Sequence, residues 1–558
     1  MLFKHSEINV KRAVGMSNQG KEIPHGSLDN FKRNWKADAM SGFLVFLIAL
    51  PLCLAISVAC GYPAIAGVYT AIIGGILSAF LSNSEMTIKG PAAGLIVVAL
   101  ACVTEFGFTG GENIEADIQA YRLALGVGVV AGLVQVFLAI MRSGALSEFF
   151  PAPVVHGLLA SIGVLVIATQ LPIMLGVQGD GAPLERLASI PSYLFEMNPA
   201  IALIGGISLL IMFGFTYIKN PKFRIIPAPM LVLIVAVPLG IYFDIGNVQS
   251  ISYFGIEHTF GPQYLVNVPD NMFSAMVFPD FSGVFTAVGI KYIIMFALIG
   301  SIESVLSAKA VDQIDPWRRK TNFDKDLLAV GAGNTLASFI GGLPMISEIA
   351  RSKANIDNGA RTRFSNLFHG VFLLGFIALV PALINQIPLA ALAAMLVFTG
   401  FRLASPKEFI HMYQVGREQF IVFLTTIIAV LATDLLMGIF IGLLTKAILH
   451  IINGAPIRSV FMPSIEVTES NDETAIVKVS KAVIFSNWLP VKQAINRQRA
   501  NKVMIDLSNT NLVGHSVMAN LHQIKDDFER VGRELAITGI EAHQPLSRHQ
   551  LAALKAKA

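Results

Sequence analysis

Two stretches that contain glycine and proline interrupt the apolar sequence at residues 87–94 and 339–347. The apolar segments after them, 92–106 and 346–357, are too short to cross about 30 Å of hydrocarbon as helices that rise about 1.5 Å per residue. A half-helix that begins inside a membrane leaves its first N–H groups unpaired and directs the positive end of its dipole inward. Two such ends that converge can bind an anion without lysine or arginine. The expected donors are the N–H groups of Ala92, Ala93 and Gly94 and of Ile346, Ser347 and Glu348.

An acidic residue, Glu303, lies in the apolar segment 284–308, about one turn from its predicted cytoplasmic end. An ionised carboxylate inside a membrane costs about 2.5–3.5 kcal/mol, and such residues usually carry protons or ions. We therefore expect Glu303 to take up a proton or a cation such as Na+, with Ser307 as a second oxygen on the same helix face. The alternative is that Glu303 reaches the cytoplasm or pairs with Lys309.

Three more charged residues lie within or just after the two breaks. Glu348 and Arg351 lie one turn apart and could form an i,i+3 ion pair at the cytoplasmic mouth. A gating or substrate-binding role for them is equally open. Lys89 could add a positive field below the first half-helix, but the favoured interpretation is that it reaches Glu85 or the cytoplasm.

Membrane-spanning helices must position these residues. The chain has 558 residues, of which 54% are hydrophobic and 14% charged, whereas soluble proteins carry about a quarter charged residues. A template of about 20 apolar residues predicts fourteen spans, two of them short, at 40–60, 63–81, 92–106, 123–141, 151–171, 199–218, 226–245, 284–308, 324–341, 346–357, 366–382, 385–402, 417–433 and 436–452. Residues 1–37 are polar, and no cleavable signal peptide is expected.

Basic residues mark the even-numbered loops, which the positive-inside rule assigns to the cytoplasm. They are Lys219, Lys222, Arg224, Arg318, Arg319, Lys320, Lys325, Arg361, Arg363, Arg402, Lys407 and Arg417. The odd-numbered loops are mainly acidic, with Glu112, Glu115, Asp117, Asp180, Glu185 and Asp280. This alternation predicts a multi-pass inner-membrane protein with both termini in the cytoplasm.

The two breaks fall at matching places, in the third span of the first seven and the third of the second seven. Because seven is odd, the second half must lie inverted relative to the first. Interrupted helices at corresponding places of inverted halves are typical of the midplane site of a transporter. The alternative is that these glycines and prolines only kink two ordinary helices.

Other function classes find no support in the sequence. Motifs for phosphate-cradling loops, zinc proteases and serine hydrolases are missing, so an enzyme is not expected. The basic residues sit in short loops beside apolar runs, which argues against a nucleic-acid partner. No cofactor is expected beyond a possible coupling Na+.

The chain divides by composition into a cytoplasmic N-terminal segment (1–37), a transmembrane domain (38–455) and a cytoplasmic α/β domain (456–558). In the last of these, 475–479 and 502–507 have the alternating or apolar pattern of strands.

Four motifs resemble those of the SulP anion transporter family, which includes sulfate permeases and bicarbonate carriers. They are Ala49–Ala55 in span one, Lys89–Gly94 in span three, Glu303–Ala308 in span eight and Gly342–Asn355 in span ten. The resemblance implies a 7+7 inverted repeat with core and gate domains, an elevator-type cycle and a homodimer. It also implies a substrate site that includes Pro51, Leu52, Ala92, Ala93, Gly94, Met345, Ile346 and Ser347.

Two departures bear on the substrate. Many sulfate permeases have Gln where this chain has Leu52, and many have small residues where it has Ser347-Glu348. This pattern looks closer to the members regarded as bicarbonate carriers. Bicarbonate is therefore favoured over sulfate.

The segment 459–558 resembles a compact STAS domain, in which 509–516 looks like the loop before the first helix. The family commonly has Asp where this chain has Gly514, which puts a phosphorylation switch at Ser516 in doubt.

Four functions remain open. The first is a cation-coupled anion symporter, which Glu303 favours because a passive pore needs no buried acid. The others are a passive channel or exchanger on the same scaffold, a dicarboxylate transporter, and a nucleobase carrier of related fold. The C-terminal domain argues against the last of these.

Overall fold

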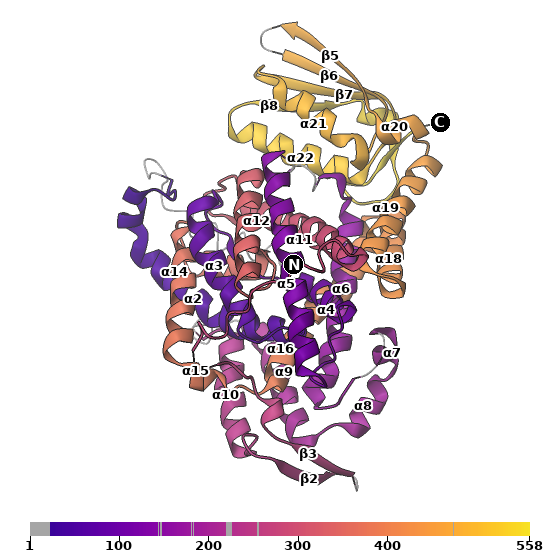
Figure 1. The fold of residues 1–558 in the computed structure, drawn as a ribbon. Coiled ribbons are helices and arrows are strands. Elements are labelled where there is room, and N and C mark those ends of the chain that lie inside the picture. Colours follow the sequence, from indigo (N-terminus) through magenta and orange to yellow (C-terminus); the bar gives the residue numbers. More distant parts are fainter. Residues whose placement is uncertain are drawn as a thin grey trace.

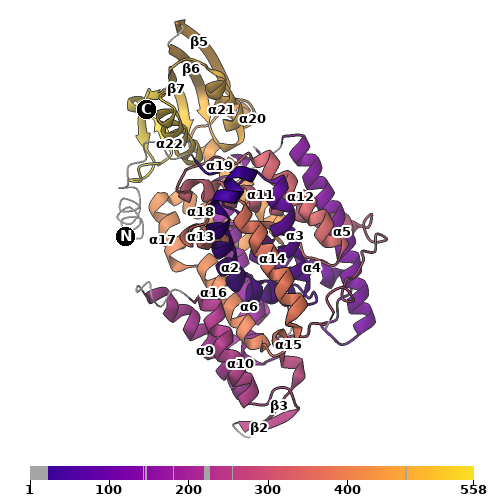
Figure 2. The same ribbon diagram turned by 90° about the vertical axis from the view of Figure 1, so that its left-hand side faces the viewer.

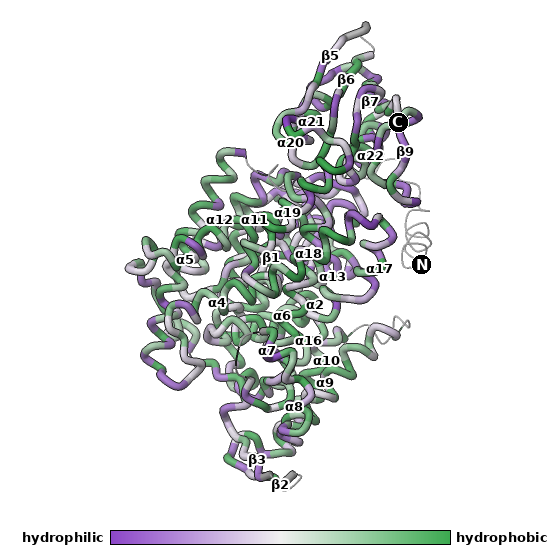
Figure 3. Tube along the Cα trace, turned by 90° about the vertical axis from the view of Figure 1, so that its right-hand side faces the viewer, coloured by the Kyte–Doolittle hydropathy of each residue, from purple (hydrophilic) through white to green (hydrophobic). Residues whose placement is uncertain are grey.

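The computed structural model describes residues 23–142, 144, 148–179, 181, 183–218, 226–253, 256–269, 271–471 and 474–557. A helical body carries a small α/β domain at one end (Figure 1). Apolar segments fill the body, while polar ones gather in the small domain and at the ends of the body (Figure 3). Four charged loop residues predicted above lie outside the described residues: Asp180, Lys219, Lys222 and Arg224.

Within the described residues, fourteen helices match the fourteen predicted spans in order. They are α2 (Leu28–Ala59), α3 (Ala66–Leu81), α4 (Ile96–Glu105), α5 (Ile114–Ile140), α6 (Ala152–Leu175), α9 (Pro199–Tyr217), α10 (Ala228–Tyr242), α11 (Ala287–Ile314), α12 (Phe323–Phe339), α13 (Ile349–Asp357), α14 (Phe364–Leu379), α16 (Leu389–Leu403), α18 (Arg417–Ala432) and α19 (Leu435–Ile452). Seven described stretches could cross a membrane by length and composition alone, among them α2, α5, α6 and α11. The prediction of a polytopic helical protein is confirmed.

Side-chain caps fix where several of these helices begin. Ser27 caps α2 through the N–H of Asn30, and Thr286 caps α11 through the N–H of Gly289. Such caps satisfy N–H groups that have no partner within the helix. Because α2 begins at Leu28, it extends into the segment 1–37 that the sequence places outside the membrane.

The helices form two bodies. In the first, α5 packs along α12, and α14 packs on α2 and α3. In the second, α6 packs on α16 and α18, and α9 packs on α16 (Figure 2). The first body takes the first four helices of each set of seven, and the second body takes the last three. The family resemblance likewise implies two domains, a core and a gate.

The loops separate to two ends of the body. The hairpin of β2 (Gln249–Tyr253) and β3 (Ile256–Phe260), between the seventh and eighth spans, lies at the end opposite the small domain (Figure 1). The loops after the fourth and eighth spans contact the small domain through Glu148 and Lys320. Even-numbered loops and the C-terminal domain therefore share one end, in agreement with the predicted alternation.

The C-terminal domain folds around one sheet with the order β5-β6-β7-β10-β9. The strand β8 also pairs with β7, along residues 502–506, whereas β10 pairs with β7 at residues 512–513. Its strands are β5 (Ser464–Asn471), β6 (Thr474–Val483), β7 (Lys502–Val513), β8 (Glu534–Thr538), β9 (His543–Pro545) and β10 (Leu554–Ala556). The helices are α20 (Ile457–Phe461), α21 (Trp488–Arg497) and α22 (His515–Arg530). The two predicted strands are confirmed as parts of β6 and β7, which run parallel.

The prediction of a loop over 509–516 before the domain's first helix is wrong. β7 continues to Val513 because Thr510 and Leu512 still pair with β6. α22 then begins at His515, and α21 precedes it in the chain.

Candidate functional site

Two short strands pair with each other at the place where both half-helices begin. β1 (Ile88–Pro91) precedes α4, and β4 (Met345–Glu348) precedes α13. They pair antiparallel, with Lys89 opposite Ser347 and Gly90 opposite Ile346. The two breaks, which lie far apart in the sequence, are therefore one structural unit. The alternative of two separate kinks is excluded.

The first half-helix begins where it was predicted. Ala92 has an extended conformation, a 3-10 turn covers Ala93–Leu95, and α4 follows. The N–H groups of Ala92, Ala93 and Gly94 thus lie at the start of the helical segment, where the helix itself offers them no acceptor.

The second half-helix begins three residues later than predicted. Ile346, Ser347 and Glu348 belong to β4, and α13 starts at Ile349. The N–H of Ser347 already donates to Ser304 Oγ at 3.1 Å. The correction follows from the pairing with β1, which the sequence of this segment alone does not reveal. The N–H groups at the start of α13 are those of residues 349–351.

Glu303 of α11 lies against the start of the first half-helix. A Cβ added to Gly94 would lie 2.0 Å from Glu303 Oε1, so the carboxylate occupies the space left by the missing side chain. Glu303 is 6% exposed, and neither of its carboxylate oxygens has a hydrogen-bond partner among the described residues. A buried carboxylate without a partner is costly and marks a functional site.

The alternative placements of Glu303 are excluded. Lys309 donates instead to Asn520 of the C-terminal domain, at 3.4 Å. Ser307 is buried one turn from Glu303 but makes no hydrogen bond with it. A role for Ser307 as a cation ligand stays a prediction.

Arg351 and Glu348 do not form the predicted ion pair; no salt bridge joins them in the described part of the chain. The Arg351 guanidinium turns toward the first half-helix, with Nη2 3.5 Å from the carbonyl oxygen of Pro91 and Nη1 3.5 Å from Cys53 Sγ. Arg351 is only 2% exposed, so it is not a residue of an open mouth. The sequence missed this placement because it depends on contacts with β1 and α2.

The remaining predicted residues lie in α2 and at the start of β4. Pro51 is buried and Leu52 half-buried in α2, one or two residues before Cys53. Met345 is fully buried, and its N–H donates to Asn334 Oδ1 at 2.5 Å. The sulfur of Met345 packs against Gly333 of α12, away from the half-helix starts.

The favoured interpretation of Lys89 is wrong. Lys89 is 1% exposed and reaches neither Glu85 nor solvent. Its ammonium lies 2.6 Å from Asp326 Oδ1 on α12. Asp326 was not singled out from the sequence, where it reads as an ordinary acid in the first turn of a helix.

In the described residues, no cluster of three or more His, Cys, Asp or Glu side chains could hold a metal ion. A cation at this site would therefore have to be bound by Glu303 together with hydroxyl or carbonyl oxygens. Such oxygen ligands suit hard cations.

Comparison with known proteins identifies the family. The sequence model of the sulfate permease family matches residues 35–426, well over half of the chain. The chain belongs to the sulfate permease family. The predicted resemblance to SulP transporters is thereby confirmed for the helical body, from α2 into α18.

Individual members of the sulfate permease family are distant. A putative sulfate transporter of Bacillus subtilis, YvdB, is 26% identical over 428 residues, which cover 75% of this chain and 74% of YvdB. The bicarbonate transporter BicA of a Picosynechococcus strain is 24% identical over 422 residues, covering 75% of this chain and 70% of BicA. The solved murine Slc26a9 anion transporter matches with a TM-score of 0.63 at 14% identity, covering 90% of this chain and 84% of that structure. This last match shows a shared fold.

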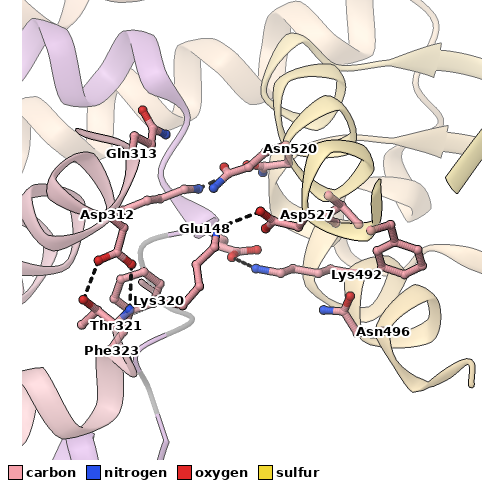
Figure 4. A pocket seen from close by; sticks show the side chains of 14 residues that line it. Glu148, Asp312, Gln313, Lys320, Thr321, Phe323, Lys492, Asn496, Asn520 and Asp527 are labelled. Carbon is pink, nitrogen blue, oxygen red and sulfur yellow. Dashed lines mark hydrogen bonds and ion pairs between the residues drawn. The ribbon is translucent and has the colours of Figure 1, made fainter. Parts of the chain in front are cut away.

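The C-terminal domain of this family member contacts the helical body around a cavity of about 170 Å³ (Figure 4). Lys492 of α21 forms an ion pair with Glu148, in the connection between α5 and α6. Lys320, after α11, pairs with Asp527 of α22 at 2.8 Å. Three basic and three acidic side chains line this cavity, so its charge favours neither anions nor cations. The contacts join the small domain both to the helix that carries Glu303 and to the link between the two bodies.

Proposed function

We propose that this protein is a secondary transporter of a small inorganic anion, bicarbonate or sulfate, driven by symport with Na+ or H+. The observation that carries the proposal is the meeting of two half-helix starts on one pair of strands, with the unpartnered Glu303 carboxylate against one of them. The names of its relatives, a sulfate transporter and a bicarbonate transporter, support both candidate substrates. The protein lies in the cell's inner membrane with both termini in the cytoplasm.

The anion binds between the half-helix starts. Two positive dipole ends and unpaired N–H groups attract it from opposite sides. The Arg351 guanidinium, buried beside the Pro91 carbonyl, adds a full positive charge that no carboxylate of the described residues neutralises in an ion pair. This placement favours the substrate role of Arg351 over a structural salt bridge.

Coupling follows from the contact between Glu303 and Gly94. An ionised Glu303 at the start of α4 repels an incoming anion. It also competes with the anion for the positive end of the helix dipole. A proton or a cation on Glu303 removes that repulsion, so each ligand increases the affinity for the other. A passive channel or exchanger has no use for this carboxylate.

Movement of the first body against the second gives an elevator-type cycle. Both half-helices and Glu303 belong to the first body, so the site travels intact. The homodimer implied by the family resemblance would anchor the second body in the lipid.

Uptake of labelled bicarbonate and sulfate into proteoliposomes, with Na+ and pH gradients imposed separately, tests the proposal. Accumulation above the external concentration that depends on one of the two gradients is expected. Uptake that only equilibrates the anion, whatever the cation gradient, would refute symport. Dicarboxylates should be included as competitors, because backbone N–H donors accept them as well.

We propose that the C-terminal domain is regulatory or assembling. Deletion of residues 459–558 should change the transport rate by about fivefold or more, the range of ordinary coupling between sites. The order in which anions compete should stay the same, because no residue of the substrate site lies in the deleted domain. Competition uptake on purified protein measures both, and an altered order of anions would contradict the assignment.

A point variant tests the contact between Lys320 and Asp527 separately from loss of the whole domain. Lys320→Glu places like charges opposite Asp527 and should reproduce the rate change of the deletion. The reversed pair, Lys320→Glu with Asp527→Lys, should restore the rate. Both residues are partly exposed, at 52% and 35%, so folding should be unaffected.

A further inference from the structure

A closed network of polar side chains lies between α12 and the paired strands β1 and β4. Lys89 Nζ donates to Thr87 Oγ1 and Asp326 Oδ1, both at 2.6 Å, and to Ser347 Oγ at 2.8 Å. These three bonds use every donor of the ammonium group. Asp326 Oδ2 accepts from Ser347 Oγ at 3.0 Å, and Asp326 Oδ1 accepts from Ser82 Oγ at 2.5 Å.

The network extends to the helix that carries Glu303. Ser304 Oγ donates to Ser347 Oγ at 3.1 Å and accepts from the Ser347 N–H at 3.1 Å. Ser304 directly follows Glu303 in α11. Lys89 and Asp326 therefore connect β1, β4, α11 and α12, which together present both half-helix starts and the carboxylate.

The register of β1 and β4 shows on which side of these strands the Lys89–Asp326 ion pair lies. Lys89 and Ser347 face each other across the two strands, and they point to the same side, toward α12. The next pair along, Gly90 and Ile346, points to the other side, where the Arg351 guanidinium lies against Gly90. The Lys89–Asp326 ion pair thus lies on the α12 side of β1 and β4, out of contact with the space between the half-helix starts.

We propose that Lys89 and Asp326 are a positioning pair, which fixes the two half-helix starts relative to each other and so sets the affinity for the anion. This inference rests on the proposed anion transport. Hydrogen bonds from rigid helices hold a binding site more precisely than two short paired strands can by themselves. The pair is neutral overall, so it acts through geometry and not through a net charge at the anion.

The test replaces both charges together, Lys89→Met with Asp326→Leu. A single replacement would leave one buried charge without its partner and unfold the protein, whereas a buried pair can often be exchanged for apolar residues. The double variant should raise the KM for the anion about tenfold, as expected for the loss of one or two positioning hydrogen bonds. Its maximal rate should change much less.

The matched control is a second buried lysine of the helical body, Lys446, which is paired with a largely buried glutamate. Lys446 Nζ lies 3.3 Å from Glu418 Oε1, and Lys446 is likewise 1% exposed, but the pair joins α18 and α19 in the second body. Lys446→Met with Glu418→Leu should leave the KM unchanged. Equal KM values in the wild type and the Lys89/Asp326 double variant would overturn the inference.

Two further measurements keep the inference testable if the double variant folds poorly or the substrate is misassigned. Ser304→Ala keeps both charges paired and removes only the link to α11, and it should raise the KM by a smaller factor. Hydrogen–deuterium exchange needs no substrate: loss of the pair should speed exchange in residues 87–105 and 345–357 together, and the control pair should not. If the wild type carries no anion, the proposed function fails, and unchanged exchange in these two segments would separately refute the positioning pair.

Discussion

Glu303→Gln should bind the anion but fail to accumulate it against a gradient. Gln keeps the shape of the side chain that fills the space beside Gly94, but it neither takes up a proton nor provides a full negative charge for a cation. The amide resembles the neutral form of the carboxyl group, so repulsion of the anion is removed permanently. Binding then no longer depends on the coupling ion.

Binding and uptake should be measured on one preparation of this variant. Accumulation should fall to the equilibrium value, while anion exchange across the membrane continues. Glu105→Gln is the matched control, because Glu105 ends α4 near the surface, 2.8 Å from Lys291 Nζ. A Glu303→Gln protein that still concentrates the anion, with unchanged dependence on pH and Na+, would make Glu303 a structural residue.

Ala93→Leu should lower the rate of transport about a hundredfold while the protein remains folded. Ala93 opens the helical turn at the first half-helix and is half-buried, so a larger side chain there would project into the proposed anion site. Displacement of a bound group by about 1 Å can cost about a hundredfold in rate. Initial uptake rates should therefore fall by about two orders of magnitude.

Ala432→Leu provides the comparison, since Ala432 is exposed at the end of α18 and the added volume is the same. Its uptake should equal that of the wild type. Size-exclusion elution and thermal unfolding should match for all three proteins. Normal uptake by Ala93→Leu would move the anion site away from this half-helix.

Ser347, which the sequence also places in the substrate site, is a poor position for the same bulky replacement. Ser347 is fully buried, and its hydroxyl bonds to Lys89, Asp326 and Ser304. A large side chain would disrupt this network before it could reach the anion. Folding and binding effects could not be separated there.

The spans, the two breaks and the α/β domain could all be predicted from the sequence. Span length follows from the thickness of the hydrocarbon, which requires about 20 apolar residues whatever the neighbours are. Gly90-Pro91 and Gly341-Gly342 interrupt the helical pattern through their own backbone properties, the first within β1 and the second just after α12. Glu303 stood out because an acid in an apolar helix is anomalous without any knowledge of its contacts.

How these parts meet depends on contacts between segments that are far apart in the sequence. The start of α13 moved to Ile349 because β4 pairs with β1, and the partner of Lys89 is 237 residues away in Asp326. The direction of Arg351 likewise depends on Pro91 and Cys53, which lie in other elements. Local sequence encodes where a chain must break and which side chains are costly to bury. The partners that satisfy a buried charge come from distant segments, and they are fixed only when those segments pack.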